Sequence, residues 1–172
     1  MSNPLLQVIL IAVLLTAVVT DLRSYRIPNW LTVPAMAGGV LIHTLLNGPA
    51  GLILSLQGLG LGLGLFLIFY TMGGMGAGDV KLMAAVGSFL GPAGVLYASV
   101  ITMLLGGLYA VIAMVTHWGF RESVQRVWIM PTTLALPQEV ASPAAAPRSQ
   151  LQLRYALVIG LGTLLSQMLV AG

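Results

Sequence analysis

Residues 73–81 read GGMGAGDVK, and this stretch decides the fold because it interrupts a chain that is otherwise almost entirely apolar. Four glycines within six residues give a backbone that can adopt positive φ angles and approach a partner closely, which the interior of a helix does not need. Asp79 then opens the next apolar run, where its oxygens can accept hydrogen bonds from the first free N–H groups of a helix. The stretch is therefore either a helix cap or a break with a chemical role, and a second carboxylate, Asp21, bears on that choice.

The composition is that of a membrane protein. Hydrophobic residues make up 58% and charged residues 6% of the 172 residues, whereas a soluble domain carries about 25% charged residues. The chain has no cysteine and two isolated histidines, so we expect neither a metal site nor another cofactor. The net charge of +3 comes from basic residues scattered among apolar runs, which is typical of topology determinants and not of a nucleic-acid-binding surface.

The apolar runs predict an all-α fold, a polytopic bundle of about six membrane-spanning helices in a single domain of residues 1–172. The expected spans are approximately 4–20, 30–46, 51–72, 80–90, 93–116 and 151–170. A lone strand cannot satisfy its backbone hydrogen bonds in lipid, so the Leu/Gly alternation of the third run is also assigned to a helix. That helix carries two small-residue stripes on which a neighbouring helix can pack closely. The stripes are Gly58/Gly62 and Gly60/Gly64.

The boundary between the fourth and fifth spans has two readings. Residues 80–116 are too many for one crossing at about 1.5 Å per residue, and Gly91-Pro92 is the best break. Alternatively, Pro92 only kinks the fourth span and the turn lies near Gly106-Gly107.

Two further segments are expected outside the spans. Residues 120–128 have apolar side chains at helical spacing, which suits a helix lying in the membrane surface or a cap on the bundle. Residues 131–150 hold four prolines and an alanine-rich run, and we expect a mobile cytoplasmic loop there.

The expected topology has the N-terminus outside. It places the loops 21–29, 73–81 and 117–150 on one side, and every charged residue falls in these loops or, for Arg154, at the start of the last span. By the positive-inside rule that side is cytoplasmic. Asp21 and Asp79 are therefore expected on the same face of the membrane.

Two carboxylates on one face allow a specific chemistry if their helices are neighbours. Like charges a few ångströms apart in a poorly solvated site cannot both persist, so the pair would share one proton and supply both a base and an acid. Aspartic proteases activate water in this way. The structural alternative is that Asp79 caps a helix and Asp21 is a helix-end carboxylate paired with Arg23 or Arg26.

At this point the sequence resembles a known family. The segments DLRSYRIPNW from Asp21 and GAGDVKL from Gly76 are similar to the two signature segments of the type IV prepilin peptidases, the G-x-G-D family of intramembrane aspartyl proteases. Residues 153–157, LRYAL, are similar to a looser third segment that usually has proline where Arg154 stands. The resemblance implies six helices and catalysis by two aspartates. The catalytic residues it implies are Asp21 and Asp79, and its supporting motif positions are Gly76, Gly78, Lys81, Arg26, Pro28 and Asn29.

The resemblance also implies a function. A multi-pass inner-membrane endopeptidase would remove the basic leader from prepilin or pseudopilin precursors at the cytoplasmic face. The substrate, a hydrophobic helix, would enter from the surrounding lipid. Long family members carry an N-terminal cytoplasmic segment with paired cysteines and also N-methylate the new terminus. This chain resembles the short forms associated with Flp/Tad pili, so methylation is not expected. Lys81 would either bind an acidic group of the substrate, lower the pKa of the neighbouring aspartate, or extend its ammonium group to the membrane interface.

Three other classes of protein compete with this interpretation. A small proton- or cation-coupled transporter could use the same two aspartates, although neither an internal repeat nor a charge near mid-membrane is visible. Presenilin-like proteases share G-x-G-D but place tyrosine before the first catalytic aspartate, where this chain has Thr20. A catalytically idle assembly partner would keep the bundle without needing both acids.

Overall fold

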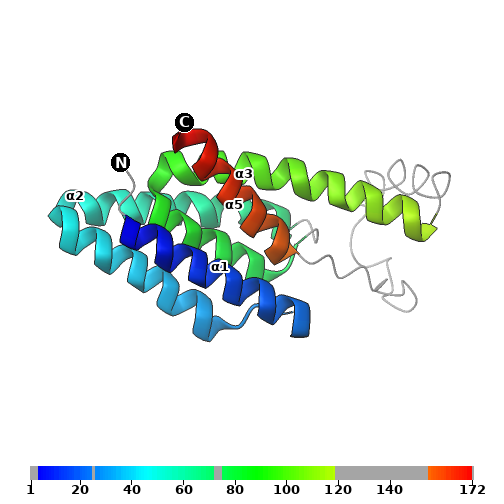
Figure 1. The fold of residues 1–172 in the computed structure, drawn as a ribbon, viewed down its shortest axis with the longest axis horizontal. Helices are drawn as coiled ribbons and strands as arrows, with labels where there is room; N and C mark the ends of the chain where they lie inside the picture. The colour runs from blue at the N-terminus through cyan, green and yellow to red at the C-terminus, as the bar shows by residue number, and fades with distance from the viewer. Residues whose placement is uncertain (1–3, 25, 72–74, 119–154, 172) are drawn as a thin grey trace, which may run out of the picture. The chain divides into compact units, whose positions relative to one another are not determined.

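A computed structural model describes residues 4–24, 26–71, 75–118 and 155–171, and these residues form four helices (Figure 1). The helices are α1 (Pro4–Ser24), α2 (Asn29–Thr71), α3 (Ala77–Trp118) and α5 (Tyr155–Ala171). Helices α1, α2 and α3 are each long and apolar enough to cross a membrane, while α5 is a shorter apolar helix. The expected all-α class is therefore confirmed. The expected surface segment 120–128 and the loop 131–150 lie outside the described residues.

Each of the two long helices contains one non-helical glycine. Gly48 in α2 has φ 62° and ψ −145°, and Gly91 in α3 has φ 70° and ψ −176°. Positive φ is costly for residues with a Cβ atom, so glycine is the residue suited to both positions. A proline follows each glycine and begins the next helical segment, where its missing N–H leaves no intrahelical bond unmade. The breaks divide α2 into 29–47 and 49–71, and α3 into 77–90 and 92–118.

The chain reverses its direction at Gly48. The contacts between α2 and the first segment of α3 show this reversal. The first segment of α2 runs parallel to that α3 segment, and the second segment of α2 runs antiparallel to it. The pairs in contact are Asn29–Lys81 and His43–Phe89 for the first segment, and Gly58–Gly87 and Gly62–Met83 for the second. Helix α2 is therefore a helical hairpin.

The chain also reverses at Gly91, which lies against Gly58. From this point Gly62 is one turn further along α2, and it lies against both Met83, before the break, and Val95, after it. The two segments of α3 therefore leave Gly91 in the same direction, as the arms of a second hairpin. Because α3 stays helical beyond this point as far as Trp118, the alternative turn near Gly106-Gly107 is not found.

The chain divides into two compact units. Unit 1 comprises Met1–Gly106 and Arg154–Gly172, and it holds every residue of the candidate site described below. Unit 2 comprises Gly107–Leu153, of which the structure describes only the end of α3.

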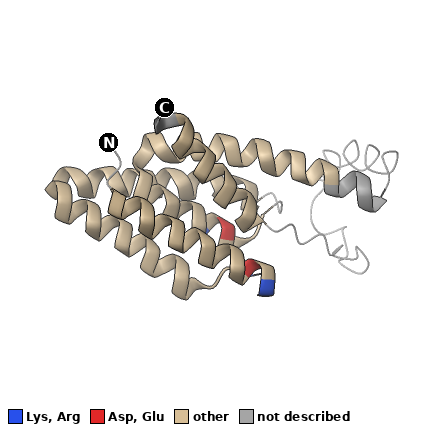
Figure 2. Cartoon of the chain, viewed as in Figure 1, with Lys and Arg blue, Asp and Glu red and all other residues tan. Residues whose placement is uncertain are grey.

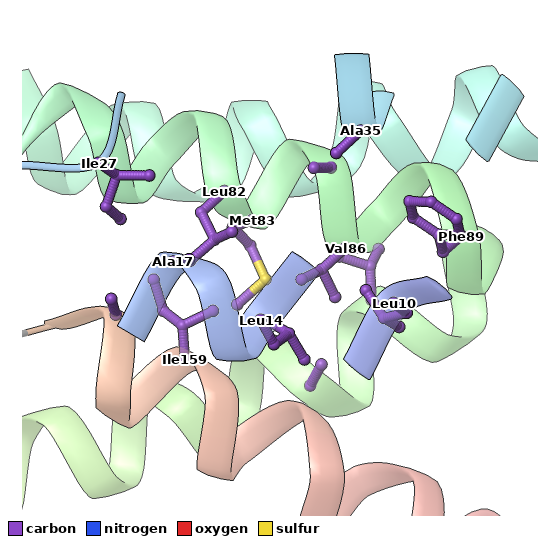
Figure 3. Packing of buried hydrophobic residues seen from close by; sticks show 14 of the residues in the cluster. Leu10, Leu14, Ala17, Ile27, Ala35, Leu82, Met83, Val86, Phe89 and Ile159 are labelled. Carbon is purple, nitrogen blue, oxygen red and sulfur yellow. The ribbon is translucent and has the colours of Figure 1, made fainter. Parts of the chain in front are cut away.

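The first segment of α3 lies at the centre of unit 1. Every residue from Leu82 to Phe89 is buried. Figure 3 shows Met83 and Val86 of this segment in one cluster with Leu14 of α1 and Ile159 of α5. Lipid tails are as apolar as these side chains, so close packing supplies much of the attraction between the helices.

One of the two expected glycine stripes carries this packing. Gly58 lies so close to Gly87 that a Cβ atom on either residue would collide with the carbonyl oxygen of the other. A Cβ atom on Gly60 or Gly64, in contrast, would meet nothing within 4 Å among the described residues. The expectation that both stripes serve helix packing is therefore wrong for Gly60/Gly64, because that face of α2 points away from the neighbouring helices.

Candidate active site

The two aspartates singled out in the sequence approach each other in unit 1. Asp21 lies in the last turn of α1 and is 7% exposed, and Asp79 lies in the first turn of α3 and is 9% exposed. The two carboxyl groups are close enough for the charge of Asp21 to act on Asp79. In Figure 2 the acidic and basic segments of α1 and α3 gather at one end of these helices. The site is therefore a pair of buried acids from two helices that are distant in the sequence.

Asp79 is held in place by the turn that precedes it. The backbone N–H of Gly76 donates a hydrogen bond to Asp79 Oδ2 over 3.2 Å. The carbonyl oxygen of Gly76 in turn accepts from the N–H groups of Asp79 (3.1 Å) and Val80 (3.4 Å). Gly76 therefore occupies the N-cap position, and Asp79 lies three residues on, as the acid does in a capping box. The alternative interpretation of Asp79 as the N-cap residue is wrong, because the helix begins earlier, at Ala77.

The two glycines of the G-x-G-D motif have different surroundings. A Cβ atom on Gly76 would lie 3.0 Å from Asp79 Oδ2, so glycine at this position leaves room for the carboxyl group. A Cβ atom on Gly78 would lie 3.0 Å from the Cβ atom and 3.3 Å from the carbonyl oxygen of Ile27. Gly78 therefore lets the link between α1 and α2 lie against the start of α3.

That link contains the remaining motif positions. Ile27 is buried, and the carbonyl oxygen of Pro28 accepts hydrogen bonds from the N–H groups of two residues in the first turn of α2. Pro28 therefore lies directly before the first residue of α2. The Asn29 side chain is exposed, and its Oδ1 accepts a hydrogen bond of 2.8 Å from Lys81 Nζ. Arg26 is exposed to solvent.

The bond between Asn29 and Lys81 is a feature that the sequence analysis did not predict. Both residues were recognised as motif positions, but their contact joins segments 52 residues apart. One sequence feature could have indicated this contact: each residue lies near one of the two aspartates. Asn29 is eight residues after Asp21, and Lys81 is two residues after Asp79.

A second unpredicted feature is a pair of buried polar side chains at the break in α3. Pro92 has no N–H group, so the carbonyl oxygen of Ser88 lacks its helical donor, and Ser55 Oγ donates to it over 2.7 Å. The next carbonyl oxygen, of Phe89, lies 2.8 Å from His43 Nε2. A carbonyl oxygen only accepts, so the Nε2 atom carries the proton. Both arms of the α2 hairpin thus supply a donor to the broken helix.

No group of three histidine, aspartate or glutamate side chains gathers at a metal-binding distance among the described residues. The two buried carboxyl groups are suited to proton transfer, with one acting as an acid and the other as a base.

The fold and the site define a class, namely helical membrane proteins with a pair of buried acids at one end of the bundle. Comparison with known proteins refines it. The sequence profile of the type IV leader peptidase family matches residues 8–111, which include both aspartates, and the chain belongs to this family. The family resemblance inferred from the two motifs is thus confirmed.

The chain is also similar to the prepilin leader peptidase/N-methyltransferase of Bacillus subtilis (strain 168). The two are 35% identical over 115 residues, which cover 63% of this chain and 44% of the relative. The matched region therefore spans less than half the length of this curated relative. No solved structure matches the chain at a significant level.

Proposed function

We propose that the chain is a membrane aspartic endopeptidase that removes the basic leader peptide from type IV prepilin-like precursors, with Asp21 and Asp79 as its catalytic pair. One observation carries this proposal: in a chain of this family, the two motif aspartates are buried and lie within electrostatic range of each other. Buried acids of this kind are expensive to maintain in a membrane protein and commonly mark functional sites.

The mechanism follows from the pairing. Two negative charges in a poorly solvated site repel each other, so the pair holds a single proton. The ionised carboxylate takes a proton from a water molecule while the oxygen of that water attacks the peptide carbonyl carbon. The protonated carboxyl group gives its proton to the carbonyl oxygen of the peptide. The tetrahedral intermediate then collapses with transfer of a proton to the leaving amine. Neither step requires a metal ion.

The hydrogen bond from Gly76 supports the role of Asp79 in this mechanism. This bond, 3.2 Å long, restrains one carboxyl oxygen of Asp79. It therefore reduces the conformational freedom of the side chain before substrate binds. Preorganisation of this kind lowers the entropic part of the activation barrier.

The proposed topology brings the substrate to the acids. With six crossings and the N-terminus outside, the end of α1, the link before α2 and the start of α3 face the cytoplasm, where the positive-inside rule places Arg23, Arg26 and Lys81. The apolar helix of a prepilin can then lie in the inner membrane beside the bundle, with its basic leader in the cytoplasm. The junction between leader and helix then lies at the same depth in the membrane as Asp21 and Asp79. The scissile peptide must unwind locally to expose its carbonyl group. The proposed substrates are Flp/Tad pilin precursors.

The test is cleavage of prepilins by membranes that contain the wild-type protein, Asp21→Asn or Asp79→Asn. The substrates are a Flp/Tad-type precursor and a longer type IV precursor, and mass spectrometry measures leader removal. We expect the wild type to cleave the Flp/Tad-type precursor, and each substitution to lower the rate at least about a hundred-fold, since general acid and base catalysis each contribute about 10²–10⁴. Glu139→Gln, which changes an acid outside the pair, serves as the matched control.

Two results would overturn the proposal. Near-normal cleavage by either asparagine variant would exclude the catalytic pair. A wild-type protein that cleaves neither precursor, yet carries protons across proteoliposome membranes in a way that requires both aspartates, would identify a transporter.

A further inference from the structure

We infer that Asn29 and Lys81 form a latch that sets the separation of Asp21 and Asp79, so that both latch residues are positioning residues of the catalytic pair. This inference rests on the proposed function for its kinetic part only, because the separation of the two aspartates can be measured without activity.

The latch connects the two segments that carry the acids. Asp21 is followed by a short link that ends at Asn29, the first residue of α2, and Lys81 follows Asp79 in the first turns of α3. The hydrogen bond from Lys81 Nζ to Asn29 Oδ1 is 2.8 Å long, which is short for an N–H···O bond and typical of a charged donor. The bond therefore joins the link to α3 beside the site.

A second contact also attaches the link between α1 and α2 to α3. Ile27 lies against Gly78, where even a Cβ atom would be only 3.0 Å from the Ile27 side chain. Gly78 and Lys81 are three residues apart, so they share one face of the helix. Ile27 and Asn29 meet this face from the link. Two contacts on one helix face restrain rotation of the link as well as its distance from α3.

The chemistry of the pair suits a restraint beside two acids. Lysine has donors only and the asparagine Oδ1 atom only accepts, so the bond has one possible direction. Asparagine is neutral, so the latch adds no third negative charge near the two carboxyl groups. The bond is exposed, whereas the aspartates are buried. Its removal should therefore alter the geometry of the site more than the stability of the bundle.

The separation is measured by cross-linking. The chain has no cysteine, so Asp21→Cys combined with Asp79→Cys provides the only thiols for a series of bifunctional thiol reagents of increasing length. We expect the shortest reagents to react efficiently with the latch intact. Addition of Lys81→Met or Asn29→Leu should lower their yield several-fold and shift the reaction towards longer reagents. Gln57→Leu, an exposed amide elsewhere on α2, should leave the yields unchanged. Equal yields in all backgrounds would overturn the latch, whether or not the protein is a peptidase.

The kinetic test uses the same substitutions with both aspartates intact. We expect Lys81→Met and Asn29→Leu each to lower kcat about 10- to 100-fold, the effect of misplacing reacting groups by about 1 Å, with little change in KM. The double variant should be no slower than the slower single variant, because one interaction is lost in each case. Lys81→Arg keeps the donors and should restore most of the activity.

The outcomes separate this inference from the proposed function. If the wild type cleaves and the aspartate variants do not, but the latch variants have a normal kcat, the latch alone is excluded. A raised KM with normal kcat for Lys81→Met only would show instead that Lys81 contacts the substrate. Unfolding in detergent should be similar for all variants, and a latch variant that fails to fold would be replaced by Lys81→Ala or Asn29→Ala, each of which also removes one partner of the bond.

Discussion

The Asp79 carboxyl group has two neighbours of different kinds. Gly76 donates a hydrogen bond to it from the preceding turn, and Asp21, on another helix, is close enough for its charge to act on it. The sequence left open whether this aspartate is a helix cap or part of a site, and the structure shows that the two are compatible. One residue takes part in the cap interaction and remains within range of the second acid.

At this scale we predict that Gly76→Ala impairs catalysis without unfolding the protein. The new Cβ atom would lie 3.0 Å from Asp79 Oδ2, which is the end of a side chain that can rotate away, so the backbone has no need to move. We expect kcat to fall about ten-fold or more through the displaced carboxyl group, and the unfolding midpoint in detergent to stay unchanged. Gly60→Ala, where a Cβ atom meets nothing within 4 Å, is the control. A normal kcat for Gly76→Ala would show that the space beside Asp79 is not needed.

At the scale of the elements, two interrupted helices position the acids. The breaks at Gly48 and Gly91 let α2 and α3 fold into hairpins, and the buried first segment of α3 becomes the axis around which the other segments pack. The carbonyl groups that the second break leaves without helical donors are satisfied by His43 and Ser55. In hydrocarbon an unsatisfied carbonyl group would cost several kcal/mol, so these side chains stabilise the turn.

We predict that Gly48→Ala destabilises the protein through its backbone alone. Nothing lies within 4 Å of a Cβ atom at this position, but φ 62° with ψ −145° belongs to a region that residues with a Cβ atom occupy at a cost of about 1–3 kcal/mol. The free energy of unfolding in detergent should fall by about that amount. Gly38→Ala, in an uninterrupted part of the same helix and equally open, should instead raise it by about 0.5–1 kcal/mol. Equal effects of the two substitutions would contradict this account.

The helix breaks could be predicted from the sequence more accurately than the packing between the helices. The Asn-Gly-Pro and Gly-Pro turns around Gly48 and Gly91 are local signals, because positive φ and a missing N–H group are properties of the residues themselves. The glycine stripes were only half right, since a lipid-facing side of a helix is as apolar as its buried side and the sequence contains no contrast between them. The bonds of Lys81 and His43 were missed because their acceptors become neighbours only after two chain reversals. The helix start at Ala77 was missed because the cap is made by a glycine backbone.

At the scale of the whole molecule, the proposed topology predicts opposite sides for the two ends of the first α2 segment. Arg26, just before α2, and Asn47, at its hairpin turn, are both exposed. In the cysteine-free chain, Arg26→Cys should react with a membrane-impermeant thiol reagent only from the cytoplasmic side, and Asn47→Cys only from the outside. Inverted and right-side-out vesicles provide the two measurements. Reaction of both cysteines from the same side would contradict a crossing by this segment and with it the six-span arrangement.

The two hairpin turns have a consequence for biogenesis. Neither turn carries an ionisable side chain in the residues that flank Gly48 and Gly91. On the proposed topology, each pair of helical arms can enter the bilayer together without dragging a charge through it, a transfer that costs about 2.5–3.5 kcal/mol per charge even at the translocon. The polar ends of these arms then stay on the ribosome side throughout synthesis. Both aspartates can thus reach their final compartment without ever crossing the lipid.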